Sequence, residues 1–109
     1  MSEELGNCFK AAFEFVMEHP EMTLVHGICT GLGKIAGIRF AHAWVEINGY
    51  VIDPSNGKMV IMAKKQYYEL GQVEVNSLAT YKIEDMIEVA LKKETYGPWE
   101  EVFWSKGVE

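Results

Sequence analysis

The sequence contains only two cysteines, Cys8 and Cys29, among its 109 residues. Small secreted domains that depend on disulfides carry more, so no disulfide framework is expected and both thiols should be reduced. No apolar run approaches the roughly 18 residues that a transmembrane helix requires. Residues 1–4 are acidic and lack the apolar core of a signal peptide. These absences predict a cytoplasmic protein.

Clusters of basic residues are also absent. No more than two Lys or Arg residues are adjacent, the formal net charge is −6 and the pI is near 5.0. Such a chain does not favour polyanions, so nucleic acid and membrane surfaces are not expected as partners. With 49% hydrophobic residues and no repeat or linker, residues 1–109 are expected to form a single domain with one core. No feature favours a particular oligomeric state.

A hairpin is the clearest structural signal. Asn48-Gly49 separates two β-prone runs, and both central residues of a two-residue type I′ turn must accept positive φ. We therefore expect strands over about residues 38–47 and 50–53, with Ile47 opposite Tyr50. This register places one set of side chains on a single face: His42, Trp44, Glu46, Val51, Asp53 and Ser55.

Two members of that face, His42 and Asp53, can interact directly. They are diagonal neighbours at roughly 7–8 Å between backbones, which allows the carboxylate to hold the imidazole by a ring N–H. A histidine oriented by an acid is half of a nucleophilic catalytic unit. Cys8 is the candidate for the other half.

Cys8 is expected in the first turn of a helix. Apolar residues at 5, 9, 12, 13, 16 and 17 follow the helical period, Asn7 is a favoured N-cap and Pro20 stops the helix. Free backbone N–H groups and the helix dipole favour a thiolate there. The alternative is that Cys8 is only a small apolar residue at a helix start.

The remaining elements are expected from local patterns. Strands are predicted at 22–29, 72–75 and 78–81, and a helix at 83–94 that is amphipathic. Residues 63–70 should form a short helix capped by Gly71, and residues 59–62 are either a strand or a buried loop. The glycine-containing turn at 30–33 is interpreted as structural, because its spacing fits no phosphate-binding motif, and Asn56-Gly57 predicts another turn. The aromatic segment after residue 95 is expected to pack on the core, with a partner surface as the alternative.

Gly6-Asn7-Cys8 opening a helix, His42-Ala43-Trp44-Val45-Glu46 on a strand and Asp53-Pro54-Ser55 on the next resemble the transglutaminase-like branch of the papain-like cysteine proteases. The resemblance covers about residues 6–55. It implies an α+β fold in which an N-terminal helix carrying Cys8 packs on an antiparallel sheet carrying His42 and Asp53. The helix predicted at 83–94 adds a C-terminal helix to this fold. By motif position, Cys8 is the nucleophile, His42 the base and Asp53 the orienting acid.

The implied chemistry is acyl transfer at an amide through a thioester, without a cofactor. Water as acceptor gives a protease or glutamine deamidase, and an amine gives crosslinking. The substrate is expected to be a protein or peptide, because so short a chain can build only an open groove. The alternative function is a non-catalytic binding module that keeps the triad.

Several single residues have structural alternatives. Asn7 is either a helix cap or an oxyanion donor, and Trp44 either lines the cleft or forms a core wall. Cys29 is interpreted as a buried small hydrophobic residue, and His19 and His26 as structural or solvated residues. A zinc site formed by Cys8, His42 and Asp53 is chemically feasible, but no ligand pair at short metal spacing supports it, so no metal is expected.

Overall fold

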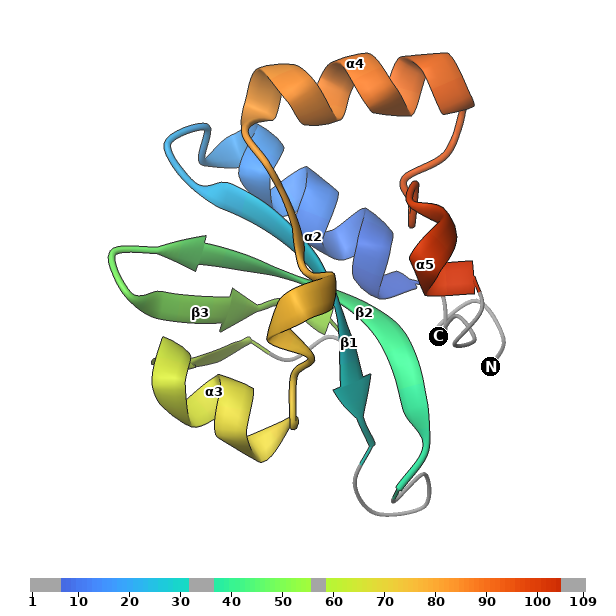
Figure 1. Cartoon of the computed structure of the whole chain (residues 1–109). Coiled ribbons are helices and arrows are strands. Elements are labelled where there is room, and N and C mark those ends of the chain that lie inside the picture. The colour runs from blue at the N-terminus through green and yellow to red at the C-terminus, as the bar shows by residue number, and fades with distance from the viewer. Residues whose placement is uncertain (1–6, 32–36, 56–58, 105–109) are drawn as a thin grey trace.

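The computed structural model describes residues 7–31, 37–55 and 59–104. Its elements follow in the order α2 (Asn7–Glu18), β1 (Thr23–Thr30), β2 (Arg39–Ile47), β3 (Tyr50–Asp53), β4 (Val60–Ala63), α3 (Lys64–Leu70), the 3-10 turn η3 (Val75–Ser77), β5 (Ala79–Tyr81), α4 (Ile83–Lys93) and α5 (Glu101–Trp104). The strands form one antiparallel sheet in the order β4-β3-β2-β1-β5 (Figure 1). The expected α+β class is confirmed, and the strand that carries His42 is central.

The β2–β3 hairpin has the predicted turn and register. Asn48 and Gly49 take positive φ angles of 52° and 82°. Ile47 pairs with Tyr50, and the ladder continues through Glu46–Val51 to Val45–Ile52. Because β3 ends one residue later, Asp53 lies at the end of this ladder, near the segment of β2 that carries His42.

The sheet separates two apolar clusters. On one face α2 packs against β2 and β1, and α4 and the C-terminal segment complete that layer (Figure 1). The buried side of α2 is the predicted stripe of Phe9, Ala12, Phe13 and Val16. On the other face, side chains from α3 and the segment after it cover Val25, Trp44 and Val51. His42 shares this second face, because it alternates with Ala41 and Ala43, which face α2.

The expected strand at 72–75 is wrong. Gln72 takes a positive φ of 48°, which interrupts an extended strand, and the chain enters η3 at Val75. Backbone hydrogen bonds from Thr30 to Gly71 and from Glu74 to Ile28 still hold the segment beside β1. The carboxylate of Glu74 also pairs with Arg39 on β2 at 2.6 Å. β5 therefore pairs with β1 and not with residues 72–75.

Smaller differences concern element ends. Gly71 follows α3 as expected. Its backbone angles are right-handed (φ −85°, ψ −2°), however, so it does not form the left-handed cap that favours glycine. Residues 60–63 form the edge strand β4, of which Val60 and Ile61 are exposed. Parts of the two predicted glycine turns, at 32–36 and 56–58, lie outside the described residues.

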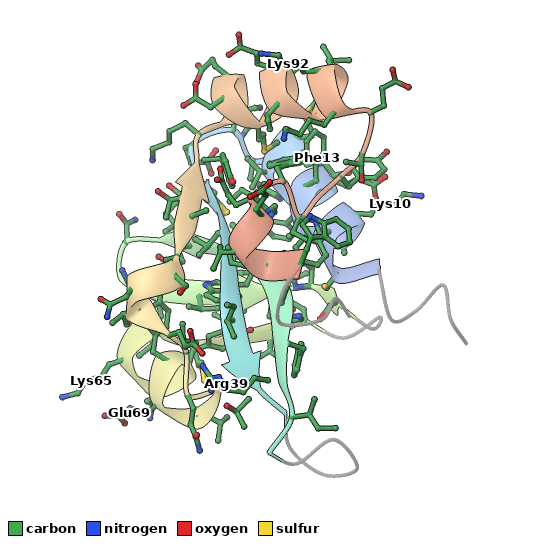
Figure 2. All side chains as sticks on the ribbon, turned by 45° about the vertical axis from the view of Figure 1, so that its right-hand side comes forward. Lys10, Phe13, Arg39, Lys65, Glu69 and Lys92 are labelled. Atoms are coloured by element: carbon green, nitrogen blue, oxygen red, sulfur yellow. The ribbon has the colours of Figure 1, made fainter. Side chains whose placement is uncertain are left out.

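The aromatic segment packs on the core, as expected. Trp99 and Phe103 are buried against the α2 face, whereas Tyr96 and Trp104 are exposed. Figure 2 shows how side chains from α2, α4 and the C-terminal segment fill this layer. Within the described ranges, the helices are too short or too polar for any to cross a membrane.

Gly27 is required for close packing behind the site. It lies opposite His42 in the β1–β2 ladder, and a Cβ at this position would be 2.6 Å from Cη2 of Trp44. We expect Gly27→Ala to reduce the free energy of unfolding by about 1–3 kcal/mol, because the buried indole must shift. Urea denaturation measures this, with Gly71→Ala as control, since its Cβ would meet nothing closer than 3.4 Å. Equal stability of the two variants would contradict the packing argument.

Candidate active site

His42 and Asp53 are in direct contact. His42 Nε2 lies 2.9 Å from Asp53 Oδ2, and the whole imidazole residue is only 8% exposed. The two residues come from neighbouring strands at the end of the hairpin ladder, as the register predicted. The sequence therefore located this acid–imidazole pair correctly.

Asp53 is held by further donors. Ser55 donates its backbone N–H to Oδ1 at 3.1 Å and its hydroxyl to the same oxygen at 2.7 Å, while the Tyr67 hydroxyl donates to Oδ2 at 2.7 Å. Burial alone would raise the pKa of Asp53. The hydrogen bond and the charge of His42 outweigh burial, together with the hydrogen bonds from Ser55 and Tyr67. They hold the pKa of Asp53 well below its usual range. Asp53 is therefore ionised at neutral pH.

Tyr67 was not identified from the sequence as a site residue. It lies on α3, fourteen positions after Asp53, in a run whose pattern indicates only a short helix. Burial, followed by the neighbouring charge of Asp53, raises the pKa of its hydroxyl, so Tyr67 remains a neutral donor. Ser55 was placed on the correct face, and its position two residues after an aspartate is typical of a local side-chain turn.

We expect Tyr67→Phe to reduce the free energy of unfolding by about 1.5–3 kcal/mol at pH 7, the usual value of a hydrogen bond to a charged group. The pKa of Asp53 should rise, because one donor to its carboxylate is lost. Chemical denaturation and NMR titration of the Asp53 carboxyl measure the two effects. Tyr50→Phe, at an exposed site on β3, is the matched control and should change stability by less than about 0.5 kcal/mol.

The two thiols lie on different elements and belong to the apolar clusters on opposite faces of the sheet. Cys8 is buried in the first turn of α2, as expected, and belongs to the apolar cluster on the α2 face. Cys29 lies on β1 two residues beyond Gly27, the partner of His42, so its side chain is on the His42 face. Both thiols are near enough to the Tyr67 hydroxyl to contribute, after burial and Asp53, to its raised pKa.

A cavity of about 270 Å³ opens on the His42 face between the sheet and α3. His42, Asp53 and Tyr67 line it together with Cys29, whereas Cys8 is not part of its lining. Cys29 is buried, in agreement with the sequence interpretation, but its place beside the acid–imidazole pair was not foreseen. The strand pattern could have indicated it, since Cys29 is diagonal to His42 once β1 and β2 are aligned.

Trp44 packs beside the imidazole of His42 on the same face of the sheet. It is fully buried, its ring centroid lies 6.1 Å from that of His42, and its indole N–H donates to Glu46 at 2.9 Å. Tyr68 also donates to Glu46, and Lys64 lies 3.4 Å from the same carboxylate. These contacts favour the core-wall interpretation of Trp44. The Asn7 side chain, the other cleft candidate, lies outside the described part of the chain.

The other two histidines lie outside this site, and the described residues contain no metal-binding cluster. His26 is fully buried among aromatic rings on the α2 face, and His19 stacks on Phe15 with a centroid distance of 4.6 Å. In the three described ranges, no three His, Cys, Asp or Glu side chains gather in an arrangement that could hold a metal ion.

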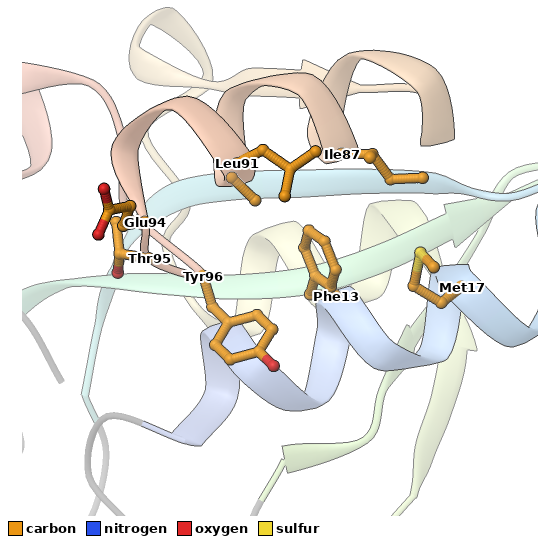
Figure 3. Close-up of a pocket in the computed structure, with 8 residues that line it drawn as sticks. Phe13, Met17, Ile87, Leu91, Glu94, Thr95 and Tyr96 are labelled. Atoms are coloured by element: carbon orange, nitrogen blue, oxygen red, sulfur yellow. The ribbon is translucent and has the colours of Figure 1, made fainter.

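A larger cavity lies away from this chemistry. It has about 600 Å³ between α2 and α4, and Figure 3 shows Phe13, Met17, Ile87 and Leu91 lining it with Tyr96. Glu94, at the end of α4, also lines it. Among the described residues no Cys or His lines this groove, so it is better suited to binding than to thiol catalysis.

Comparisons with protein-family models, with curated proteins and with solved structures gave no match to this chain.

Proposed function

We propose that the protein is a cysteine-dependent enzyme that transfers acyl groups from amides, as peptidases, glutamine deamidases and transglutaminases do. In this proposal Cys8 is the nucleophile, His42 the base and Asp53 the orienting acid, within a transglutaminase-like variant of the papain-like core. The single observation that carries the proposal is the 2.9 Å contact between His42 and Asp53, whose carboxylate also accepts hydrogen bonds from Ser55 and Tyr67.

In this proposal the contact with Asp53 decides which imidazole nitrogen of His42 acts as the base. Asp53 accepts the Nε2–H of His42, so the basic lone pair is on Nδ1. Nδ1 takes the thiol proton, and the thiolate attacks the carbonyl carbon to form a tetrahedral intermediate. The imidazolium then protonates the leaving amine as the C–N bond breaks, which leaves a thioester. Water or a second amine, deprotonated by Nδ1, cleaves the thioester and regenerates the thiol.

Cys8 is assigned as the nucleophile because it lies in the first turn of a twelve-residue helix, a position where free backbone N–H groups favour an anion. That helix packs against β2, the strand that carries His42, on the face opposite the His42 side chain. Cys29, in the cavity itself, is the competing thiol.

Acylation by p-nitrophenyl acetate tests the proposal. We expect a burst of nitrophenolate and one acetyl group per chain in the intact mass, located at Cys8 by peptide mapping. Iodoacetamide at pH 6 should likewise alkylate Cys8 much faster than Cys29. An acetyl group at Cys29 would transfer the nucleophile role to that residue, and no thiol acylation above the rate of the Cys8→Ala/Cys29→Ala double variant would refute the enzyme proposal.

A second candidate function is a binding module, favoured by the groove between α2 and α4. Leu91, Met17 and Tyr96 in its lining are 75%, 46% and 40% exposed, so apolar side chains gather at one surface site. Under this alternative both thiols react slowly and equally with iodoacetamide. The thiol measurement therefore separates the two functions.

A further inference from the structure

We infer that the cavity beside His42 is a recognition pocket for an uncharged apolar group on the acyl side of the substrate. The inference rests on the proposed acyl transfer and narrows its substrate class. The acyl donor would then be a peptide bond that follows an aliphatic or aromatic residue, in preference to a polar side-chain carboxamide.

The lining of the cavity carries this inference. Besides His42 and Asp53, its side chains are mainly apolar, and no described Lys, Arg or Glu takes part: Cys29, Thr30, Phe40, Val60, Met62, Tyr67 and Leu70, with the backbone of Gly31 and Gly71. The carboxylate of Asp53 is already occupied by His42, Ser55 and Tyr67. An anionic substrate group would be repelled by Asp53, and a cationic one would lose its hydration without a free partner.

The shape of the cavity fits one side chain. Its volume of about 270 Å³ lies below the range usual for whole drug-sized ligands. Leu70 and Val60 are 55% and 38% exposed and form the mouth, whereas Cys29 and His42 are 5% and 8% exposed and form the floor. An apolar group that enters between Leu70 and Val60 therefore approaches the imidazole as it becomes buried.

Gly71 offers a way to change the pocket without disturbing the acid–imidazole pair. A Cβ at this position would lie 3.8 Å from Cys29 Sγ, which is ordinary contact, and its backbone angles suit any residue. Larger side chains at position 71 should therefore occupy the floor of the cavity. Leu70→Asp changes the mouth instead, by placing a charge where the apolar group enters.

The test measures kcat/KM for p-nitrophenyl acetate, butyrate and the anionic succinate, each divided by its rate of hydrolysis in buffer. Each methylene that becomes buried should raise the value roughly fourfold. We expect butyrate, with two more methylenes, to exceed acetate by about 15-fold in the wild-type protein, and succinate to fall below both. Gly71→Leu and Leu70→Asp should bring the butyrate-to-acetate ratio close to one. Leu91→Asp, in the groove between α2 and α4, is the matched control and should leave the ratio unchanged.

The outcomes separate the inference from the proposed function. Acylation with equal normalised rates for acetate and butyrate, or a ratio that Gly71→Leu leaves unchanged, would overturn the pocket assignment and leave acyl transfer standing. No acylation by any of the three esters would overturn the proposed function, and the pocket assignment with it.

Discussion

His42→Ala is expected to abolish thiol acylation in an otherwise folded protein. The imidazole takes the thiol proton and returns it to the leaving group, and loss of a general acid–base typically costs about 10²–10⁴-fold in rate. The ring lines the cavity and contacts Asp53, Phe40 and Trp44 without belonging to the larger apolar cluster on the α2 face, so removing it should leave the sheet intact. The measurement is the burst of nitrophenolate from p-nitrophenyl acetate, with far-UV circular dichroism to verify the fold.

Alanine variants of the two cysteines complete this prediction. Cys8→Ala should remove the acyl-enzyme entirely, whereas Cys29→Ala should retain it, with altered preference for the acyl group because Cys29 lines the pocket. Wild-type acylation in Cys8→Ala would show that the nucleophile is assigned incorrectly. Unchanged acylation in His42→Ala would be more serious, since no part of the acid–imidazole argument would then contribute to reactivity.

Asp53→Asn should also be costly. An amide can present its NH₂ group to Nε2, which stabilises the wrong tautomer; in a Ser-His-Asp triad the same change costs about 10⁴-fold. Because the pKa of Asp53 is held well below its usual range, protonation of this residue cannot cause an activity loss between pH 8 and pH 5. Any acid limb in that interval must therefore come from another group.

The acid–imidazole pair was predictable because it depends on local chain geometry. Asn48-Gly49 specifies the turn, the turn specifies the register, and the register brings Asp53 to His42. The stripe of α2 follows from helical periodicity for the same reason. These features need no knowledge of how distant segments meet.

The rest of the site depends on contacts between distant segments. Tyr67 reaches Asp53 only because α3 covers one face of the sheet, and Cys29 reaches the cavity only because β1 pairs with β2. The failed strand at 72–75 has the same cause, since its alternating pattern is overridden by the positive φ of Gln72 and by the pairing of β5 with β1. Single-segment patterns do not contain this information.

His26 is expected to make the stability of the fold depend strongly on pH. It is fully buried, and neither ring nitrogen has a hydrogen-bond partner among the described residues. Its ring packs instead against Phe9, Trp99 and Tyr81, with centroid distances of 4.9, 4.9 and 5.2 Å. Burial, with a smaller contribution from the charge of His42, lowers the pKa of His26 to about 3.

This pKa makes stability depend on pH in a definite direction. The unfolded chain binds a proton at His26 below about pH 6.5, whereas the folded chain does not until about pH 3. The unfolded state therefore binds more protons in this interval, and the free energy of unfolding must fall as the pH falls, by up to about 1.4 kcal/mol per pH unit. The low pKa of Asp53 acts in the same direction, but only below about pH 4, where the unfolded carboxyl becomes protonated.

In the wild-type protein, His26 should lower the free energy of unfolding by about 2–3 kcal/mol between pH 6.5 and pH 4.5. His26→Leu is therefore expected to remove most of this loss. Leucine has a similar volume and needs no hydrogen bond, although it forfeits the aromatic edge contacts and can shift the stability at neutral pH in either direction. The slope against pH, and not the absolute stability, is thus the decisive readout, from urea denaturation at several pH values. His19→Gln, at a partly exposed histidine, is the matched control and should keep the wild-type slope, because its ring is not enclosed in the core. If His26→Leu keeps the wild-type slope of stability against pH, then the folded wild-type protein accommodates a protonated His26. His26 would then not be the source of acid sensitivity.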